Sequence, residues 1–252
     1  MSTSKQGPLA GNENTEKQWQ SIYIIGGVFT IITLIGVTLD VIIGNVTGGN
    51  LSELPQTATE RFVQFQANPW LGLYNLDLLN TVNQIFFIPG YFALYAVQRK
   101  TNSAYALLAL IVFLVGTTVF VAANSALPML ELSHKYAAAT TESQKTLLAA
   151  AGEAMLARGA HGSLGVFFSF FLPNIAGLIM SFAMLTGKVF SKANSYAGII
   201  GSALMMLYVV LVTFAPGVKD MATAFAMPGG LLLMAWMIMF TIRLFHVAKQ
   251  AG

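Results

Sequence analysis

The chain has 252 residues, of which 56% are hydrophobic and only 9% are charged, and its mean hydropathy is +0.68. An average soluble domain has roughly 25% charged residues, so this composition excludes an ordinary soluble protein and indicates an integral membrane protein. The formal charge of +3 comes without a run of basic residues, which excludes nucleic acid as an expected partner, and the lack of cysteine excludes disulfides, thiolate metal ligands and a cysteine nucleophile.

Residues 1–20 are polar and lack an apolar face, so they predict a flexible cytoplasmic tail. The first apolar run covers about 22–43, with Asp40 near its far end. It is long enough to cross a bilayer and has no small-residue cleavage site, so it predicts a retained span and not a removed signal peptide. The following loop contains TATERFVQFQ (57–66), which predicts a short amphipathic helix in the membrane interface with Phe62 and Phe65 toward the lipid.

The second predicted span, about 70–97, is apolar enough to cross a membrane yet contains several polar side chains. They are Asn75, Asp77, Asn80, Asn83 and Gln84. On a helix, Asp77, Asn80 and Gln84 share one narrow face, and Tyr91 extends that face inward. An unpartnered polar group costs roughly 2–7 kcal/mol in an apolar medium, so this face is expected to line the bundle interior or a wet cavity.

The third span is predicted at about 103–126, and a polar, alanine-rich insertion follows at 131–160. Thr141 and Gln144 in this insertion have the spacing of a capping box, which marks a helix start. The expected apolar strip of that helix consists of Leu147, Leu148, Ala151 and Met155. The pattern predicts an external amphipathic helical hairpin that covers one mouth of the bundle.

The last three spans are predicted at about 162–185, 193–215 and 231–247. The first of these contains Pro173 and Asn174, a pair that indicates a kink and leaves Asn174 to bond a freed carbonyl or a neighbouring helix. The predicted fold is therefore all-α. It is a polytopic membrane bundle of six transmembrane helices over residues 21–249, with the helical insertion between the third and fourth spans.

Most of the basic residues fall on one side of this six-span topology. Short loops rich in lysine and arginine stay in the cytoplasm, so both termini are predicted to be cytoplasmic, in a bacterial cytoplasmic membrane, and the insertion external. The same topology puts Asp40, Asp77 and His161 at one level near the outer surface, where they are expected to line a polar site. The candidates for a ligand-binding site or polar network are Asp40, Asp77, Asn80, Asn83, Gln84, His161 and Asn174.

A structural interpretation of these residues stays open. Asp77 and Asn80 are equally compatible with a buried hydrogen-bond network that fixes helix register, and His161 with a helix cap. No metal site is predicted, because His161 has no partner at HxxxH or HExxH spacing. The chain also lacks a Walker loop, a GxSxG elbow and a GxGxxG turn, so catalytic residues and cofactors stay unknown and a non-enzymatic protein is favoured.

The predicted spans and the polar segments between them follow an order that is similar to that of a known protein family. The second helix contains the polar NLDLLN (75–80), an external polar insertion follows the third span, and the cytoplasmic turns are short and basic. Over roughly residues 20–248 the chain resembles a family of bacterial six-span integral membrane proteins catalogued as a domain of unknown function. The resemblance implies a fold and a membrane location and transfers no catalytic residue.

Three functional hypotheses follow from the sequence. The first is a membrane protein without catalytic activity, either an accessory subunit of a larger membrane complex or a binder of lipids or small ligands. The second is a small secondary carrier that uses Asp77. The third is an intramembrane hydrolase or transferase that uses Asp40, Asp77 and His161. The expected partners are membrane lipids and a larger membrane complex.

Overall fold

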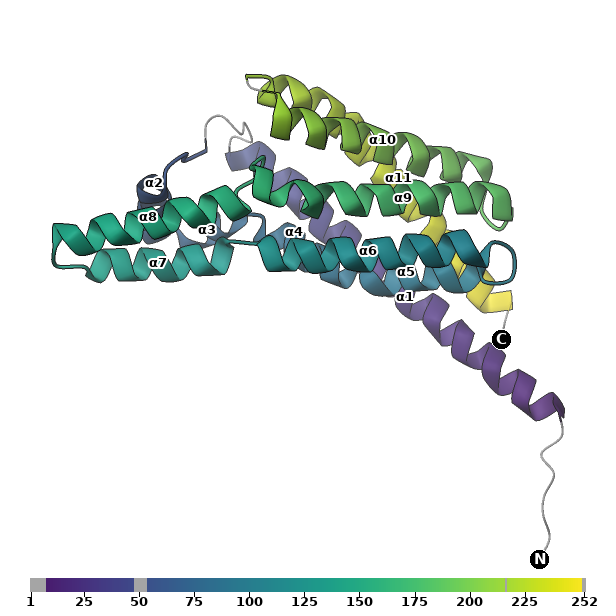
Figure 1. Cartoon of the computed structure of the whole chain (residues 1–252). Helices are drawn as coiled ribbons and strands as arrows, with labels where there is room; N and C mark the ends of the chain where they lie inside the picture. The colour runs from purple at the N-terminus through teal and green to yellow at the C-terminus, as the bar shows by residue number, and fades with distance from the viewer. Residues whose placement is uncertain (1–7, 48–53, 216, 251–252) are drawn as a thin grey trace, which may run out of the picture.

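A computed structural model describes residues 8–47, 54–215 and 217–250, and every regular element in these ranges is a helix (Figure 1). The predicted all-α class is therefore confirmed. The helices are α1 (Pro8–Thr47), α2 (Ala58–Ala67), α3 (Pro69–Tyr74), α4 (Leu78–Phe86), α5 (Ile88–Gln98), α6 (Ser103–Ala123), α7 (Ala126–Ala138), α8 (Glu142–Gly159), the short 3-10 helix η1 (Leu164–Val166), α9 (Phe167–Gly187), α10 (Lys192–Phe214) and α11 (Lys219–Gln250).

Five segments of the described chain are long and apolar enough to cross a membrane, which indicates an integral membrane protein. They are Lys17–Thr47, Ser103–Ala138, Leu164–Gly187, Lys192–Phe214 and Met221–Gln250. Helix α6 alone has 21 residues, which at 1.5 Å per residue matches the roughly 30 Å of a bilayer's hydrocarbon. The predicted second span, 70–97, is not among the five.

The prediction of one continuous helix over 70–97 was wrong, because the chain turns at residues 75–77 and the helix is briefly irregular at Phe87. Helix α3 ends at Tyr74 and a turn at residues 75–77 leads into α4. Asp77 in this turn has a left-handed backbone (φ 59°), which aspartate tolerates better than most residues and a helix interior does not allow. A second break precedes α5, which has Pro89 in its first turn, where the missing N–H costs no hydrogen bond.

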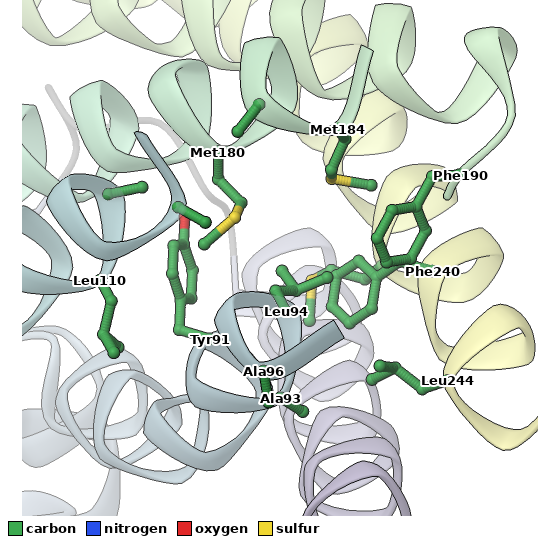
Figure 2. Close-up of a cluster of buried hydrophobic side chains, with 14 of the residues drawn as sticks. Tyr91, Ala93, Leu94, Ala96, Leu110, Met180, Met184, Phe190, Phe240 and Leu244 are labelled. Atoms are coloured by element: carbon green, nitrogen blue, oxygen red, sulfur yellow. The ribbon is translucent and has the colours of Figure 1, made fainter. Parts of the chain in front are cut away.

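The long helices pack in a closed ring. Helix α1 contacts α5, α5 contacts α6, α6 contacts α9, α9 contacts α10, α10 contacts α11, and α11 returns to α1. Figure 2 shows Tyr91 and Leu94 of α5, Met180 and Met184 of α9, and Phe240 of α11 converging in the interior of this ring. All five side chains are at most 2% exposed, so the bundle is filled by packed apolar groups.

A second apolar cluster holds together α2, α3, α7 and α8, which we call the cap. Phe62 and Phe65 of α2 are 0% and 1% exposed, and the Phe62 ring lies 5.1 Å from that of Tyr136 of α7. Ser133 of α7 also donates a 3.0 Å hydrogen bond to the Phe62 carbonyl. The predicted amphipathic helix exists, but its placement with Phe62 and Phe65 toward lipid was wrong, because α7 and α8 cover that face.

Helix α8 begins with the predicted capping box: Thr141 accepts from the Gln144 N–H, and the Gln144 side chain accepts from the Thr141 N–H. The predicted apolar strip was only partly right: Met155 packs against the cap cluster, whereas Leu147 is 72% exposed and Ala151 is also exposed. The buried face instead includes Gly152, and a methyl group there would meet Phe62 at 2.7 Å. Glycine contributes little to an apolar pattern, yet its missing side chain lets the two helices approach.

The cap and the chain termini lie at opposite ends of the bundle (Figure 1). Helix α1 already starts at Pro8, so residues 8–20 of the predicted tail are helical, and residues 1–7 lie outside the described ranges. That the tail is flexible and cytoplasmic stays a prediction. Two aromatic side chains in the first half of α1 contact the residue that follows the end of α5. Arg99, after α5, stacks 3.9 Å from the ring centre of Trp19 and donates a 2.6 Å hydrogen bond to Tyr23.

Candidate functional site

The turn between α3 and α4 fixes the position of Asp77. Its N–H donates to the Tyr74 carbonyl at 3.0 Å, and its own carbonyl accepts from the Thr81 N–H and hydroxyl at 3.0 and 2.9 Å. The carboxylate makes no capping bond to α4. It accepts instead a 3.0 Å hydrogen bond from the Asn80 side chain, and its second oxygen points to another part of the chain.

That second oxygen meets His161, which lies in the connection between α8 and η1. Nδ1 of His161 is 2.9 Å from Asp77 Oδ2, and Nε2 is 2.8 Å from the Tyr208 hydroxyl of α10. With a neutral ring, Nδ1–H donates to Asp77 and Nε2 accepts from Tyr208. With a protonated ring, both nitrogens donate. Asp77, His161 and Tyr208 thus form one continuous hydrogen-bonded chain across three elements.

Asp40 of α1 lies at the edge of this chain. The Tyr74 hydroxyl donates a 2.9 Å hydrogen bond to the Asp40 carbonyl, which ties the α3 end to α1. The Asp40 side chain is half-buried and lies within electrostatic range of Asp77 and His161. The structure therefore brings together Asp40, Asp77, Asn80 and His161 at the cap end of the bundle.

The other three candidate residues lie elsewhere. Asn83 is 7% exposed and faces α1, where it packs directly against Gly36. Gln84 is half-buried on α4. Asn174 donates a 2.8 Å hydrogen bond to the Phe170 carbonyl of its own helix, next to Pro173, which lies inside α9 and has no N–H to donate. Asn83 thus packs between two helices, and Asn174 bonds the backbone of its own helix.

Arg61 of α2 belongs to the site and was missed from the sequence. Its side chain is only 4% exposed, donates to Gln64 Oε1 at 3.3 Å, and has an Nε without a partner among the described residues. Burial lowers the pKa of Arg61 to about 10, although the charges of Asp77 and Glu60 oppose that change. A sequence signal was available, because Arg61 lies four residues before Phe65 and so shares the apolar face of the predicted helix. Tyr208, in a plain apolar run, gave no such signal.

Electrostatics favour a charged His161. Burial by itself lowers the pKa of an imidazole, but here Tyr208 and the Asp77 carboxylate outweigh burial and hold the pKa of His161 above its usual value. The side chains of His161 and Asp77 are 18% and 14% exposed, so the pair is largely shielded from water. The raised pKa favours an ion pair between His161 and Asp77, in which Nδ1–H points to the carboxylate and Nε2–H to the Tyr208 hydroxyl.

The arrangement is suited to holding and passing a proton. No group of three or more His, Asp or Glu side chains is placed to bind a metal ion in the part of the chain that the structure describes. One cavity lies at the far end of α11 and another on the outer surface of α6, and neither is lined by Asp77, His161 or Tyr208. The three side chains retain little contact with solvent, since His161, Asp77 and Tyr208 are 18%, 14% and 8% exposed.

Fold and site define a helical membrane protein in which Asp77, His161 and Tyr208 form a hydrogen-bonded chain at the cap end of the bundle. Over residues 22–241 the chain matches a family described as a domain of unknown function (DUF4386), and it belongs to that family. The predicted resemblance to an uncharacterised family is thereby confirmed. No curated protein and no solved structure matches the chain.

Proposed function

We propose that this protein is a small proton-coupled membrane carrier, in which Asp77 and His161 bind the coupling proton. The observation that supports the proposal is the continuous bonding of Asp77, His161 and Tyr208 in a shielded position. Ionisable groups at the membrane level of a bundle are costly to bury and typically mark ion or substrate pathways. A histidine between a carboxylate and a hydroxyl both stores a proton and transfers it along the chain.

The same chain joins the cap to the ring. His161 follows α8 of the cap, whereas Tyr208 belongs to α10 of the ring. Loss of the His161 proton removes the charge attraction to Asp77 and reduces the bond to Tyr208 to a neutral one, which weakens the tie between cap and ring. Proton binding and cap position are then linked, as a coupled carrier requires.

The proposal includes a six-span topology with cytoplasmic termini and an external cap. Helices α4 and α5 together cover residues 78–98, about 30 Å at 1.5 Å per residue, and they fill the place in the ring between α1 and α6. The short connections at the end opposite the cap contain Arg99, Lys100, Lys188 and Lys192. Basic short loops favour the cytoplasmic side.

The geometry favours a carrier over a hydrolase. In a hydrolase of the Asp–His type, the second imidazole nitrogen activates a water or a nucleophilic hydroxyl next to the substrate. Here that nitrogen is occupied by Tyr208, which is 8% exposed. A phenol held in this way serves proton transfer better than attack on a substrate.

Cysteine labelling tests the proposal, because the natural chain has no cysteine. Ser202 is fully buried in α10, and its hydroxyl has no partner among the described residues. It lies six residues, or about 9 Å, from Tyr208 along the helix, toward the end opposite the cap. Ser202→Cys would be reconstituted in vesicles and exposed to a membrane-impermeant maleimide on either side. Ala150→Cys on the exposed face of α8 would report the orientation of the protein.

A carrier exposes its central site alternately to both sides, so the Ser202→Cys variant is expected to be labelled from each side. The ratio of the two labelling rates should change between about pH 6 and about pH 10, as the pH approaches the raised pKa of His161. The ratio is compared because the reactive thiolate fraction itself rises with pH on both sides. Adding Asp77→Asn should remove that pH difference. Labelling from one side only, at every pH, would rule out the carrier and return the interpretation to an accessory subunit or ligand-binding protein.

A further inference from the structure

The cavity at the end of α11 lies at the opposite end of the bundle from Asp77 and His161. Its volume is about 830 Å³. One wall is apolar and includes Met239, Ile242 and Phe245 of α11. Ile242 is 65% exposed, so this wall continues onto the outer surface of the bundle. The connection between α9 and α10, at residues 188–191, closes the other side.

The opening of the same cavity is basic. Arg243, His246 and Lys249 line it at intervals of three residues on α11, so they lie along one side of the helix. Arg243 is fixed by a 2.9 Å hydrogen bond from its Nε to the Val189 carbonyl, which leaves its two terminal nitrogens for another acceptor. The lining residues include no aspartate or glutamate. The cavity thus joins positive charge to an apolar wall.

These two features fit one class of ligand. We propose that this cavity binds an anionic phospholipid, with the phosphate between Arg243 and Lys249 and an acyl chain along Ile242 and Met239. The end of α9 at Gly187 and the start of α10 at Lys192 mark the level at which the chain leaves the apolar layer. Lipid headgroups lie at that level, and Lys and Arg near a membrane surface attract anionic lipids.

The apolar wall distinguishes a lipid from a free phosphate. A free phosphate would use the basic side chains alone and would leave Ile242 and Met239 without a role. A phospholipid covers both. The site is independent of the proposed carrier function, because no residue of the Asp77–His161 chain takes part in it.

The experiment compares two double variants with the same loss of charge at the same end of the molecule. Arg243→Gln with Lys249→Gln changes the cavity. Lys17→Gln with Lys100→Gln changes basic residues that do not line it. Each full-length protein would be purified in detergent and titrated with phosphatidylglycerol or phosphatidylcholine, and the bound lipid would be counted by native mass spectrometry. Inorganic phosphate would be added in a competition arm.

The natural protein should bind phosphatidylglycerol in preference to phosphatidylcholine. The cavity variant should lose that affinity roughly tenfold, and the control variant should change less than about twofold. If the cavity variant does not fold, His246→Gln with Lys249→Gln keeps the Arg243 bond and should still lose roughly fivefold. Equal losses in cavity and control variants would overturn the proposal, as would displacement of the lipid by inorganic phosphate at matched concentration.

Discussion

Replacing Asp77 by asparagine removes the charge of the buried pair and keeps the shape of the side chain. In the natural protein the carboxylate accepts from His161 at 2.9 Å and from Asn80 at 3.0 Å. Hydrogen bonds to charged groups contribute about 1.5–3 kcal/mol and neutral ones about 1 kcal/mol. Each of the two hydrogen bonds should therefore weaken by about 1 kcal/mol when the carboxylate becomes an amide. Asp77→Asn should thus lower the free energy of unfolding by about 2 kcal/mol at pH 6.

The free energy of unfolding that Asp77→Asn loses should become smaller as the pH rises. The folded-state pKa of His161 is raised above the unfolded value of about 6.5. The stabilisation from its proton is therefore fully present below about pH 6.5 and is lost as the pH rises through the folded-state pKa. The free energy of unfolding of the natural protein should thus fall toward alkaline pH. The difference in this free energy between the natural protein and Asp77→Asn should become smaller over the same range.

The assay is unfolding in mild detergent, followed by tryptophan fluorescence, from about pH 6 to about pH 10. Glu131→Gln is the matched control, because it removes one carboxylate from an exposed pair with Lys135, whose side chains are 62% and 60% exposed. That pair should contribute less than about 1 kcal/mol. An Asp77→Asn protein as stable as Glu131→Gln, or one with the pH dependence of the natural protein, would refute the assigned charge pair.

Two further substitutions test the packing. Gly36→Ala places a methyl group directly on Asn83, where α1 crosses α4. It should lower the free energy of unfolding by about 1–3 kcal/mol and lower the melting temperature accordingly. Gly230→Ala is the control, because Gly230 has open space around it and an alanine there should be neutral or stabilising. Phe62→Ala should loosen the cap by about 3–5 kcal/mol and speed hydrogen exchange in α8, while Val63→Ala, at a 63% exposed position, should leave both unchanged. An intact cap in the Phe62 variant would contradict the assigned core.

Local patterns in the sequence were enough to predict the all-helical class, most of the long helices and the membrane location. Long apolar runs need backbone bonds satisfied within one segment, so they can only be helices in a bilayer. The start of α8 was predictable because a capping box is made by residues three apart. The face of α8 was not, because the close approach at Gly152 depends on Phe62, which lies far away in the chain.

The candidate site was likewise predictable from the sequence only in part. The sequence by itself predicted that Asp77 lies within an apolar span, that His161 opens another, and that the Asp77 carboxylate needs a partner, because a lone charge in an apolar layer is too costly. Only the tertiary structure decided that they partner each other, 84 residues apart, that Tyr208 completes the chain, and that Arg61 turns inward. Which side chains meet depends on how each helix is rotated and placed against its neighbours. The packing of the whole bundle and cap fixes these rotations and positions.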